Sequence, residues 1–305
     1  MDWCLIITHS KDKTVDYMEN ILNMNLRIFR FNLDELSSYN ICIENSETKI
    51  SKVNNCIYSK DIKSIYYRKT KFPNIHGYDQ LYHSFMYKEM LMTINGLAEY
   101  LGDICLTRPS ILSRAENKIL QMHIADQIGL VQPSSLITND SKKANDFLNT
   151  VPSIIKPIAS GKIKNKDGNW GFLQTNFLQK GTIVDNIENS PSYFQEYLNK
   201  SEGEYRIVIC GFEIYAVQII SSNEVDWRKK GSANEYKIVD LPNEIIEKCL
   251  KLMKILNIDF GAFDFIKRNG EFYFLEVNPN GEWLWLELNL GIRISHSITN
   301  YLLGR

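Results

Sequence analysis

The chain has 305 residues, a nearly balanced charge of 35 Lys and Arg against 36 Asp and Glu, and 44% hydrophobic residues. This length suggests about two domains, at roughly 100–200 residues per domain, and the apolar fraction is enough to give each a buried core, which excludes a disordered chain. Because the sequence has no basic excess, nucleic acid and anionic membrane surfaces are not expected as its main partners.

The cysteines and histidines predict neither a disulfide framework nor a zinc site. The six cysteines are scattered without a C-x-x-C pair, and each lies in or beside an apolar run, which is typical of buried thiols. The five histidines are too far apart for a compact zinc motif. No stretch approaches the roughly 18 apolar residues that span a bilayer, and the N-terminal apolar run is too short for a signal peptide. We therefore expect a cytoplasmic protein.

The N-terminal third of the chain predicts an α/β arrangement. An apolar strand over residues 3–8 precedes a run with apolar residues at helical spacing, and residues 26–32 return to strand alternation. A further strand is expected over 62–67, followed by one long helix over 79–101. This order is typical of a parallel sheet with crossover helices, which would end near Pro109.

The remainder of the chain mixes helices with strands joined by short turns. A capping box formed by Ser113 and Glu116 predicts the start of a helix that stops at Gly129. The short turns favour antiparallel pairing of the strands. The other elements expected here are helices over 141–148 and 242–256, and strands over 153–159, 170–176, 194–198, 205–210, 213–220, 261–266 and 271–278.

Two of these apolar strands each carry a carboxylate where packing alone favours a hydrophobic residue. Asp264 and Glu276 therefore need partners. A two-residue turn over 269–270 would place the two acids on opposite faces of the hairpin, whereas a three-residue loop over 268–270 brings both onto one face with Asn278. We expect the second register, because three oxygen ligands then converge as Mg²⁺ requires. The alternative is an edge hairpin with solvated acids.

A nucleotide bound at such a cation would need basic groups for its phosphates and a backbone edge for its base. The sequence contains no P-loop motif. Lys156 lies in an apolar strand, where an ammonium needs an anion or an aromatic face, and Lys118 lies in the first turns of a predicted helix, where it could also be a solvated lysine. Residues 193–198 lead into a polar linker that resembles a hinge, with Glu204 available for ribose hydroxyls.

Two arginines follow this hinge, and guanidinium groups suit phosphoryl oxygens and carboxylates. Arg206 lies in a predicted strand. Arg228 lies in the segment 225–230, where Trp227 and two lysines add an aromatic and basic surface suited to an acidic peptide. The alternative for this segment is a solvated basic loop.

The ordered motifs NK, IIKP, QEYL, GEYRI, DWRK, FDFI and FLEVNPNGEW resemble those of the ATP-grasp ligases, from about residue 110 to the C-terminus. The opening HSKDKTVDYM, with RFNLDEL, IYYRKT and DWRK, is similar to the microviridin-type or graspetide ligases, which crosslink side chains of ribosomally made peptides. The resemblance implies an α/β and α+β chain: a Rossmann-like pre-ATP-grasp domain over 1–109, a central ATP-grasp subdomain with a phosphate-covering hairpin over 110–195, and a C-terminal subdomain with the Mg²⁺ site over 196–305.

The same resemblance implies a role for each candidate residue. Lys118 and Lys156 would contact the α- and β-phosphates and the adenine of ATP, and Arg206 and Arg228 would steady the γ-phosphate and an acyl-phosphate. The remaining implied ligands are Glu196, Tyr197 and Leu198 for the adenine edge, Glu204 for ribose, and Asp264, Glu276 and Asn278 for two Mg²⁺ ions.

The expected activity is ATP-dependent carboxylate ligation, through an acyl-phosphate that a hydroxyl or amine then attacks. The resemblance implies a precursor peptide with a leader and an acidic, hydroxyl-rich core as the substrate. An Asp or Glu side chain of this peptide would be joined to a Thr or Ser hydroxyl or a Lys amine to form a macrocycle. A homodimer is also compatible with the resemblance. One alternative is a ligase that acts on a small molecule or on a protein C-terminus. The other is a catalytically silent ATP-binding regulatory protein, against which the complete set of acidic ligands argues.

Overall fold

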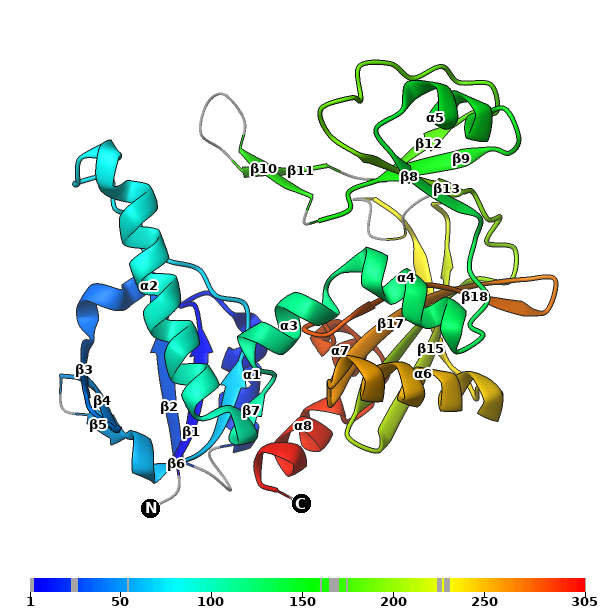
Figure 1. Ribbon diagram of the computed structural model, residues 1–305. Helices are drawn as coiled ribbons and strands as arrows, with labels where there is room; N and C mark the ends of the chain where they lie inside the picture. The colour runs from blue at the N-terminus through cyan, green and yellow to red at the C-terminus, as the bar shows by residue number, and fades with distance from the viewer. Residues whose placement is uncertain are drawn as a thin grey trace.

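The computed structural model describes residues 3–22, 27–53, 55–159, 161–164, 170–173, 175–223, 227 and 231–304. Figure 1 shows an N-terminal part in blue and cyan, a small sheet in green, and a larger sheet in yellow and orange. The two helices α3 (Pro109–Ala115) and α4 (Lys118–Gln127) connect the N-terminal part to the other two.

The N-terminal part contains the predicted parallel sheet, with strand order β2-β1-β6-β7. Its central strand β1 is buried along nearly its whole length, as expected for a parallel strand that is covered on both faces. In Figure 1 the long helix α2 runs along this sheet and extends beyond it. The elements are β1 (Trp3–Thr8), α1 (Lys13–Leu22), β2 (Arg27–Asn32), β6 (Ile62–Tyr67), α2 (Gln80–Tyr100) and β7 (Cys105–Leu106), with 3₁₀ turns at Leu33–Ser38, Ser59–Asp61 and Gly102–Ile104.

A second, antiparallel sheet in this part was not predicted. It consists of β3 (Asn40–Glu44), β4 (Glu47–Lys52) and β5 (Asn55–Tyr58). Two of the cysteines that we expected to be buried, Cys42 and Cys56, lie exposed on its outer strands, whereas the other four are buried and all six are free thiols. The sheet has one polar face, so its strands lack the continuous apolar signal of β1.

The small sheet has the antiparallel order β12-β9-β13-β8 and packs against α5 through Ala144, Leu148 and Phe194. A separate hairpin of β10 and β11 lies beside it in Figure 1. Most of residues 160–168, where the resemblance implies the phosphate-covering hairpin, lie outside the described residues. The elements are β8 (Ser135–Thr138), α5 (Ser141–Leu148), β9 (Ser153–Lys156), β10 (Lys162–Lys164), β11 (Trp170–Phe172), β12 (Asn176–Leu178) and β13 (Ser192–Glu196).

The larger sheet has the antiparallel order β16-β15-β14-β17-β18. Helix α8 packs against β14 and also against α1 and β6, so one apolar core joins this sheet to the N-terminal part. No helix among the described residues is long and apolar enough to cross a membrane. The elements are β14 (Glu204–Cys210), β15 (Glu213–Ser221), β16 (Asn234–Ile238), α6 (Asn243–Leu256), β17 (Phe260–Arg268), β18 (Glu271–Asn278), α7 (Leu284–Leu290) and α8 (Ile294–Leu302).

The helix predicted from the capping box of Ser113 begins later than expected. Ser113 lies inside α3, which starts at Pro109, a residue suited to the first helical position. The cap of α4 is Asn117, whose side chain accepts a hydrogen bond from the Leu120 N–H at 3.0 Å. This kink between two helices places Lys118 at the first position of α4.

The β17–β18 hairpin has a two-residue turn, so the predicted three-residue loop is wrong. Arg268 pairs with Glu271, and Asn269 and Gly270 have φ values of 52° and 79°. A two-residue turn of this twist needs positive φ at both positions, for which Asn-Gly is the favoured pair.

The two acids nevertheless face each other, because β18 contains a bulge. Phe265 pairs with Phe274, but the next pair is Asp264 with Glu276. Leu275 is therefore an extra residue in β18 without an opposite residue in β17, and such a bulge shifts all following side chains by one position. The predicted convergence of the acids is correct, but the bulge produces it rather than the loop.

Candidate active site

A cavity of about 460 Å³ is lined by residues of the small sheet, the larger sheet, α4 and the linker between β13 and β14. Figure 1 shows the small sheet above β17 and β18 at this place. Arg206 and Asn278 contact one of its lining residues, whereas Arg228 lies outside the described residues. The candidate residues that line the cavity are Lys118, Lys156, Glu196, Tyr197, Leu198, Glu204, Asp264 and Glu276.

The acidic cluster lies at one wall of this cavity. Asn278 Nδ2 donates to Asp264 Oδ2 at 3.1 Å and to Glu276 Oε1 at 3.3 Å. Arg206 Nη1 lies 2.8 and 2.9 Å from the two oxygens of Asp264, and Lys118 Nζ lies 3.3 Å from Glu276 Oε2. The side-chain amide of Asn278 can turn so that its oxygen, rather than its nitrogen, faces a cation. Together with the two carboxylates it then forms a donor set that fits Mg²⁺.

The guanidinium of Arg206 is not fully satisfied by the described residues. Its side chain is only 8% exposed, and among the described residues its Nε has no hydrogen-bond partner, while Nη2 donates to the Glu282 carbonyl at 3.1 Å. A buried guanidinium N–H without a partner is costly, so an anionic oxygen placed there would be strongly favoured. Gly281 allows this arrangement, because a Cβ at that position would lie 2.8 Å from Arg206 Nη2.

Lys156 has the aromatic face that its apolar strand demands. Its Nζ lies 4.5 Å from the centroid of the Tyr193 ring and donates to Gln195 Oε1 at 3.0 Å. Burial lowers the pKa of Lys156 to about 8, an effect that Lys118 reinforces and Glu276 opposes. The contacts of the ammonium therefore do not offset the cost of burying its charge, and an anion in the cavity would stabilise the charged form.

The linker after β13 offers main-chain groups to the cavity. The N–H groups of Glu196 and Tyr197 donate to the carbonyls of Ser134 and Pro152. The next N–H, that of the buried Leu198, has no hydrogen-bond partner among the described residues, although Leu198 lines the cavity. A main-chain N–H donor in the lining of such a cavity is suited to a ring nitrogen of a base.

The side chains around this linker form ion pairs that the sequence analysis did not predict. Arg268 Nη1 lies 3.1 Å from Glu196 Oε1, and Lys200 Nζ lies 2.5 Å from Glu204 Oε1. Trp227 also lines the cavity and packs against Trp285, with ring centroids 4.8 Å apart. Arg268 and Glu196 lie 72 positions apart, so spacing does not reveal their pairing, whereas Lys200 and Glu204 are only four positions apart.

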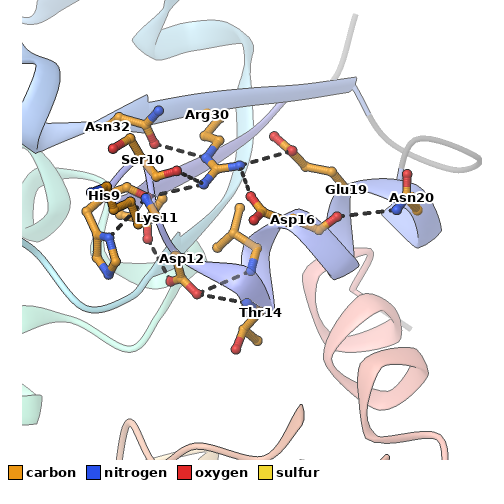
Figure 2. Close-up of polar contacts among 12 residues, drawn as sticks. His9, Ser10, Lys11, Asp12, Thr14, Asp16, Glu19, Asn20, Arg30 and Asn32 are labelled. Atoms are coloured by element: carbon orange, nitrogen blue, oxygen red, sulfur yellow. Dashed lines mark hydrogen bonds and ion pairs between the residues drawn. The ribbon is translucent and has the colours of Figure 1, made fainter. Parts of the chain in front are cut away.

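A buried ion pair in the N-terminal part was also missed. Figure 2 shows Asp12 at the start of α1, where it accepts from the Thr14 N–H at 3.0 Å. Arg68, which is 2% exposed, donates from Nε and Nη2 to Asp12 at 3.1 and 3.2 Å. Arg68 and Thr14 also reach the carboxylate of Glu282, whose carbonyl holds Arg206. The N-terminal part thus supports the loop that follows the acidic cluster.

Comparison with known proteins identifies the fold and its relatives. Residues 115–302 match the RimK-like ATP-grasp domain, and residues 3–109 match the MvdD pre-ATP grasp domain. Among curated proteins, none matches the chain.

Solved structures similar to the whole chain include a RiPP-associated ATP-grasp ligase and two macrocyclases. A RiPP-associated ATP-grasp ligase of Chryseobacterium gregarium, solved with ADP and a leader and core peptide, is 27% identical with a TM-score of 0.89, over 100% of this chain and 97% of that chain. The macrocyclase MdnC of Microcystis aeruginosa MRC, bound with precursor peptide MdnA, is 27% identical with a TM-score of 0.88, over 99% of each chain. The macrocyclase MdnB of the same organism is 24% identical with a TM-score of 0.82, over 99% of each chain, and supports the fold alone. The chain therefore belongs to the RimK-like ATP-grasp family, with an MvdD-type pre-ATP-grasp domain at its N-terminus.

Proposed function

We propose that the chain is an ATP-dependent ligase that activates Asp or Glu side chains of a ribosomally made precursor peptide and joins them to Thr or Ser hydroxyls or Lys amines, forming macrocyclic esters or amides. The convergence of Asp264, Glu276 and Asn278 with Lys118 and Lys156 at one cavity carries this proposal. The 27% identical ligase of Chryseobacterium gregarium was solved with ADP and a leader and core peptide, which supports a peptide substrate.

In this proposal different residues of the cavity bind the adenine, the ribose and the phosphates of ATP. The Leu198 N–H and the main chain of Glu196 and Tyr197 bind the adenine edge, and Glu204 binds the ribose. Lys118 and Lys156 bind the phosphates. We expect three domains, over residues 1–109, 110–195 and 196–305. With this division the cavity is lined by residues of the second and third domains.

The remaining candidate residues act at the reacting end. Two Mg²⁺ ions held by Asp264, Glu276 and Asn278 would supply neutralisation of the phosphate charge. Arg206 and Arg228 would hold oxygens of the γ-phosphate and of the substrate carboxylate in line. The carboxylate oxygen then attacks the γ-phosphorus and ADP leaves, after which the acceptor hydroxyl or amine attacks the acyl carbon and phosphate leaves.

Turnover of ATP with different acceptors tests this function. With Mg²⁺ and a candidate precursor peptide that carries a leader and an acidic, hydroxyl-rich core, ADP should form in proportion to the rings made. Free amino acids or glutathione precursors in place of the peptide should leave ADP formation at its background rate. Rapid ADP formation with a free amino acid, and none with the peptide, would favour a small-molecule ligase.

Lys156 gives a prediction for the nucleotide-binding step. An ADP phosphate beside Lys156 favours its charged form, so binding raises a pKa that is about 8 in the free protein. Without Mg²⁺, the affinity for ADP should be at its maximum and independent of pH below pH 8. It should fall as the pH rises above 8, because binding then requires uptake of a proton by Lys156. Titration calorimetry across this pH range tests the sign.

The matched variant for this measurement is Lys156→Met, which keeps most of the aliphatic side chain and removes its charge. It should weaken ADP binding below pH 8 and remove the pH dependence near pH 8. A pH dependence that persists in Lys156→Met would assign it to another group.

We also propose that the protein acts in the cytoplasm. The reaction consumes ATP, and all six cysteines are free thiols, a state that reducing compartments maintain.

A further inference from the structure

Strand β18 carries Glu276 and Asn278 and lies at the edge of the larger sheet. An edge strand has main-chain N–H and C=O groups that no neighbouring strand pairs. A slip of β18 by one residue would turn Glu276 to the opposite face, away from Asp264. Because β18 also contains the bulge at Leu275, its turn alone does not determine where Glu276 points.

Two contacts hold the outer edge of β18, one on each side of the bulge. Before it, the Phe274 N–H donates to the Val131 carbonyl at 2.8 Å. After it, the side-chain amide of Gln121 pairs with both main-chain groups of Val277: Oε1 accepts from the N–H at 2.9 Å, and Nε2 donates to the carbonyl at 2.8 Å. Val277 is the residue between Glu276 and Asn278, so this contact lies at the centre of the acidic cluster.

Gln121 is itself held in one orientation. Its side chain is buried, and Nε2 also donates to the Ala115 carbonyl at the end of α3, at 2.6 Å. It lies on α4 three positions after Lys118, whose Nζ is 3.3 Å from Glu276 Oε2, and residues three apart share a helix face. One face of α4 thus fixes Glu276 in two ways. Lys118 pairs with its carboxylate, and Gln121 forms hydrogen bonds to the main chain of the next residue, Val277.

We infer that Gln121 is a positioning residue for the metal site, and that its amide fixes the register of β18 after the bulge so that Glu276 and Asn278 face Asp264. The inference rests on the proposed function, which takes this cluster to be the Mg²⁺ site. A merely structural glutamine would affect stability alone, whereas a positioning residue affects the coupling between Mg²⁺ and nucleotide.

The test compares Gln121→Met with Ile124→Ala, using the full-length chain. Met keeps the length of the side chain and loses all three hydrogen bonds; Ile124 is a buried residue of the same helix, one turn on, that packs in the core. Titration calorimetry with ADP, with and without Mg²⁺, measures the gain in affinity that Mg²⁺ causes. In Gln121→Met this gain should fall on the order of 10-fold while ADP alone binds as in the wild type. In Ile124→Ala the gain should persist despite a lower melting temperature.

Hydrogen exchange adds a readout that needs no ligand. The peptide that contains Val277 should exchange faster in Gln121→Met than in Ile124→Ala, relative to the strands of the same sheet. An unchanged Mg²⁺ gain in Gln121→Met, or an equal loss in both variants, would overturn the inference.

Two further outcomes keep the test decisive. If Gln121→Met does not fold, Gln121→Glu replaces it, since Glu still accepts from the Val277 N–H but cannot donate to either carbonyl when ionised. The same loss of Mg²⁺ gain is expected there, and its absence would count against the role. If the wild-type chain itself binds no ADP, the proposed function fails rather than the positioning of β18 alone.

Discussion

Replacing Glu276 by Gln, or Asp264 by Asn, is expected to lower the rate of ADP formation on the order of 10²-fold or more. Each change removes one negative charge from the proposed Mg²⁺ site with almost no change in volume. The two acids face each other across β17 and β18, and Asn278 donates to both, so each replacement leaves this cluster with one carboxylate where the proposed site has two. Single-turnover measurement of ADP release with precursor peptide, ATP and Mg²⁺ gives the rate.

The matched control is Glu271→Gln, an exposed acid at the start of the same strand. It makes the same chemical change outside the cavity and should leave both the rate and the melting temperature unchanged. A normal rate of ADP release in Glu276→Gln or Asp264→Asn, in protein that is folded, would remove the metal-site assignment.

Arg68→Met is expected to reduce the free energy of unfolding by about 3–5 kcal/mol. Arg68 and Asp12 are almost fully buried, and Arg68 supplies two of the hydrogen bonds to the Asp12 carboxylate. Methionine would fill most of the space but would leave a buried carboxylate without its counter-charge. Urea denaturation at neutral pH measures the loss. Lys248→Met is the surface control, because its partner Glu244 is 73% exposed, and breaking that solvent-screened pair should cost far less stability than Arg68→Met.

The effect of Arg68→Met should also depend on pH. Burial raises the pKa of Asp12, but the charge of Arg68 and hydrogen bonds from Arg68, Thr8 and the Val15 N–H together bring it below its ordinary value. A carboxyl with a lowered pKa in the folded state stabilises the protein above its unfolded pKa of about 4, and this contribution is lost as the pH falls through the folded value. The stability difference between wild type and Arg68→Met should therefore shrink on acidification below about pH 4. A difference that stays constant across this range would contradict the role of the ion pair.

The parts of the fold that the sequence predicted best have strong local signals. The strand over 62–67 and the helix over 141–148 were predicted with the bounds that the structure has, because each is a periodic segment flanked by polar residues. The sheet of β3, β4 and β5 was missed, because its strands are half exposed and carry few apolar residues. The family match confirms the ATP-grasp fold and the pre-ATP-grasp domain that the ordered motifs implied.

The candidate site was predictable in composition but not in geometry. A carboxylate in an apolar strand is visible in the sequence at Asp264 and Glu276, and so is a lysine in an apolar strand at Lys156. The bulge at Leu275 is not visible, since it needs no glycine and depends on contacts outside the strand such as that of Gln121. The Asp12–Arg68 pair was missed for a related reason, because 56 positions separate two residues that only the fold brings together.

Intact-mass spectrometry of the precursor peptide tests the proposed function most directly. After incubation of a candidate precursor peptide, with leader and core, with the protein, ATP and Mg²⁺, the peptide should lose the mass of one water molecule for each ring, with one ADP formed per ring. The same core without its leader should react far more slowly. An unchanged mass after prolonged incubation, under conditions in which the protein binds ATP, would contradict the assignment of this chain as a peptide macrocyclase.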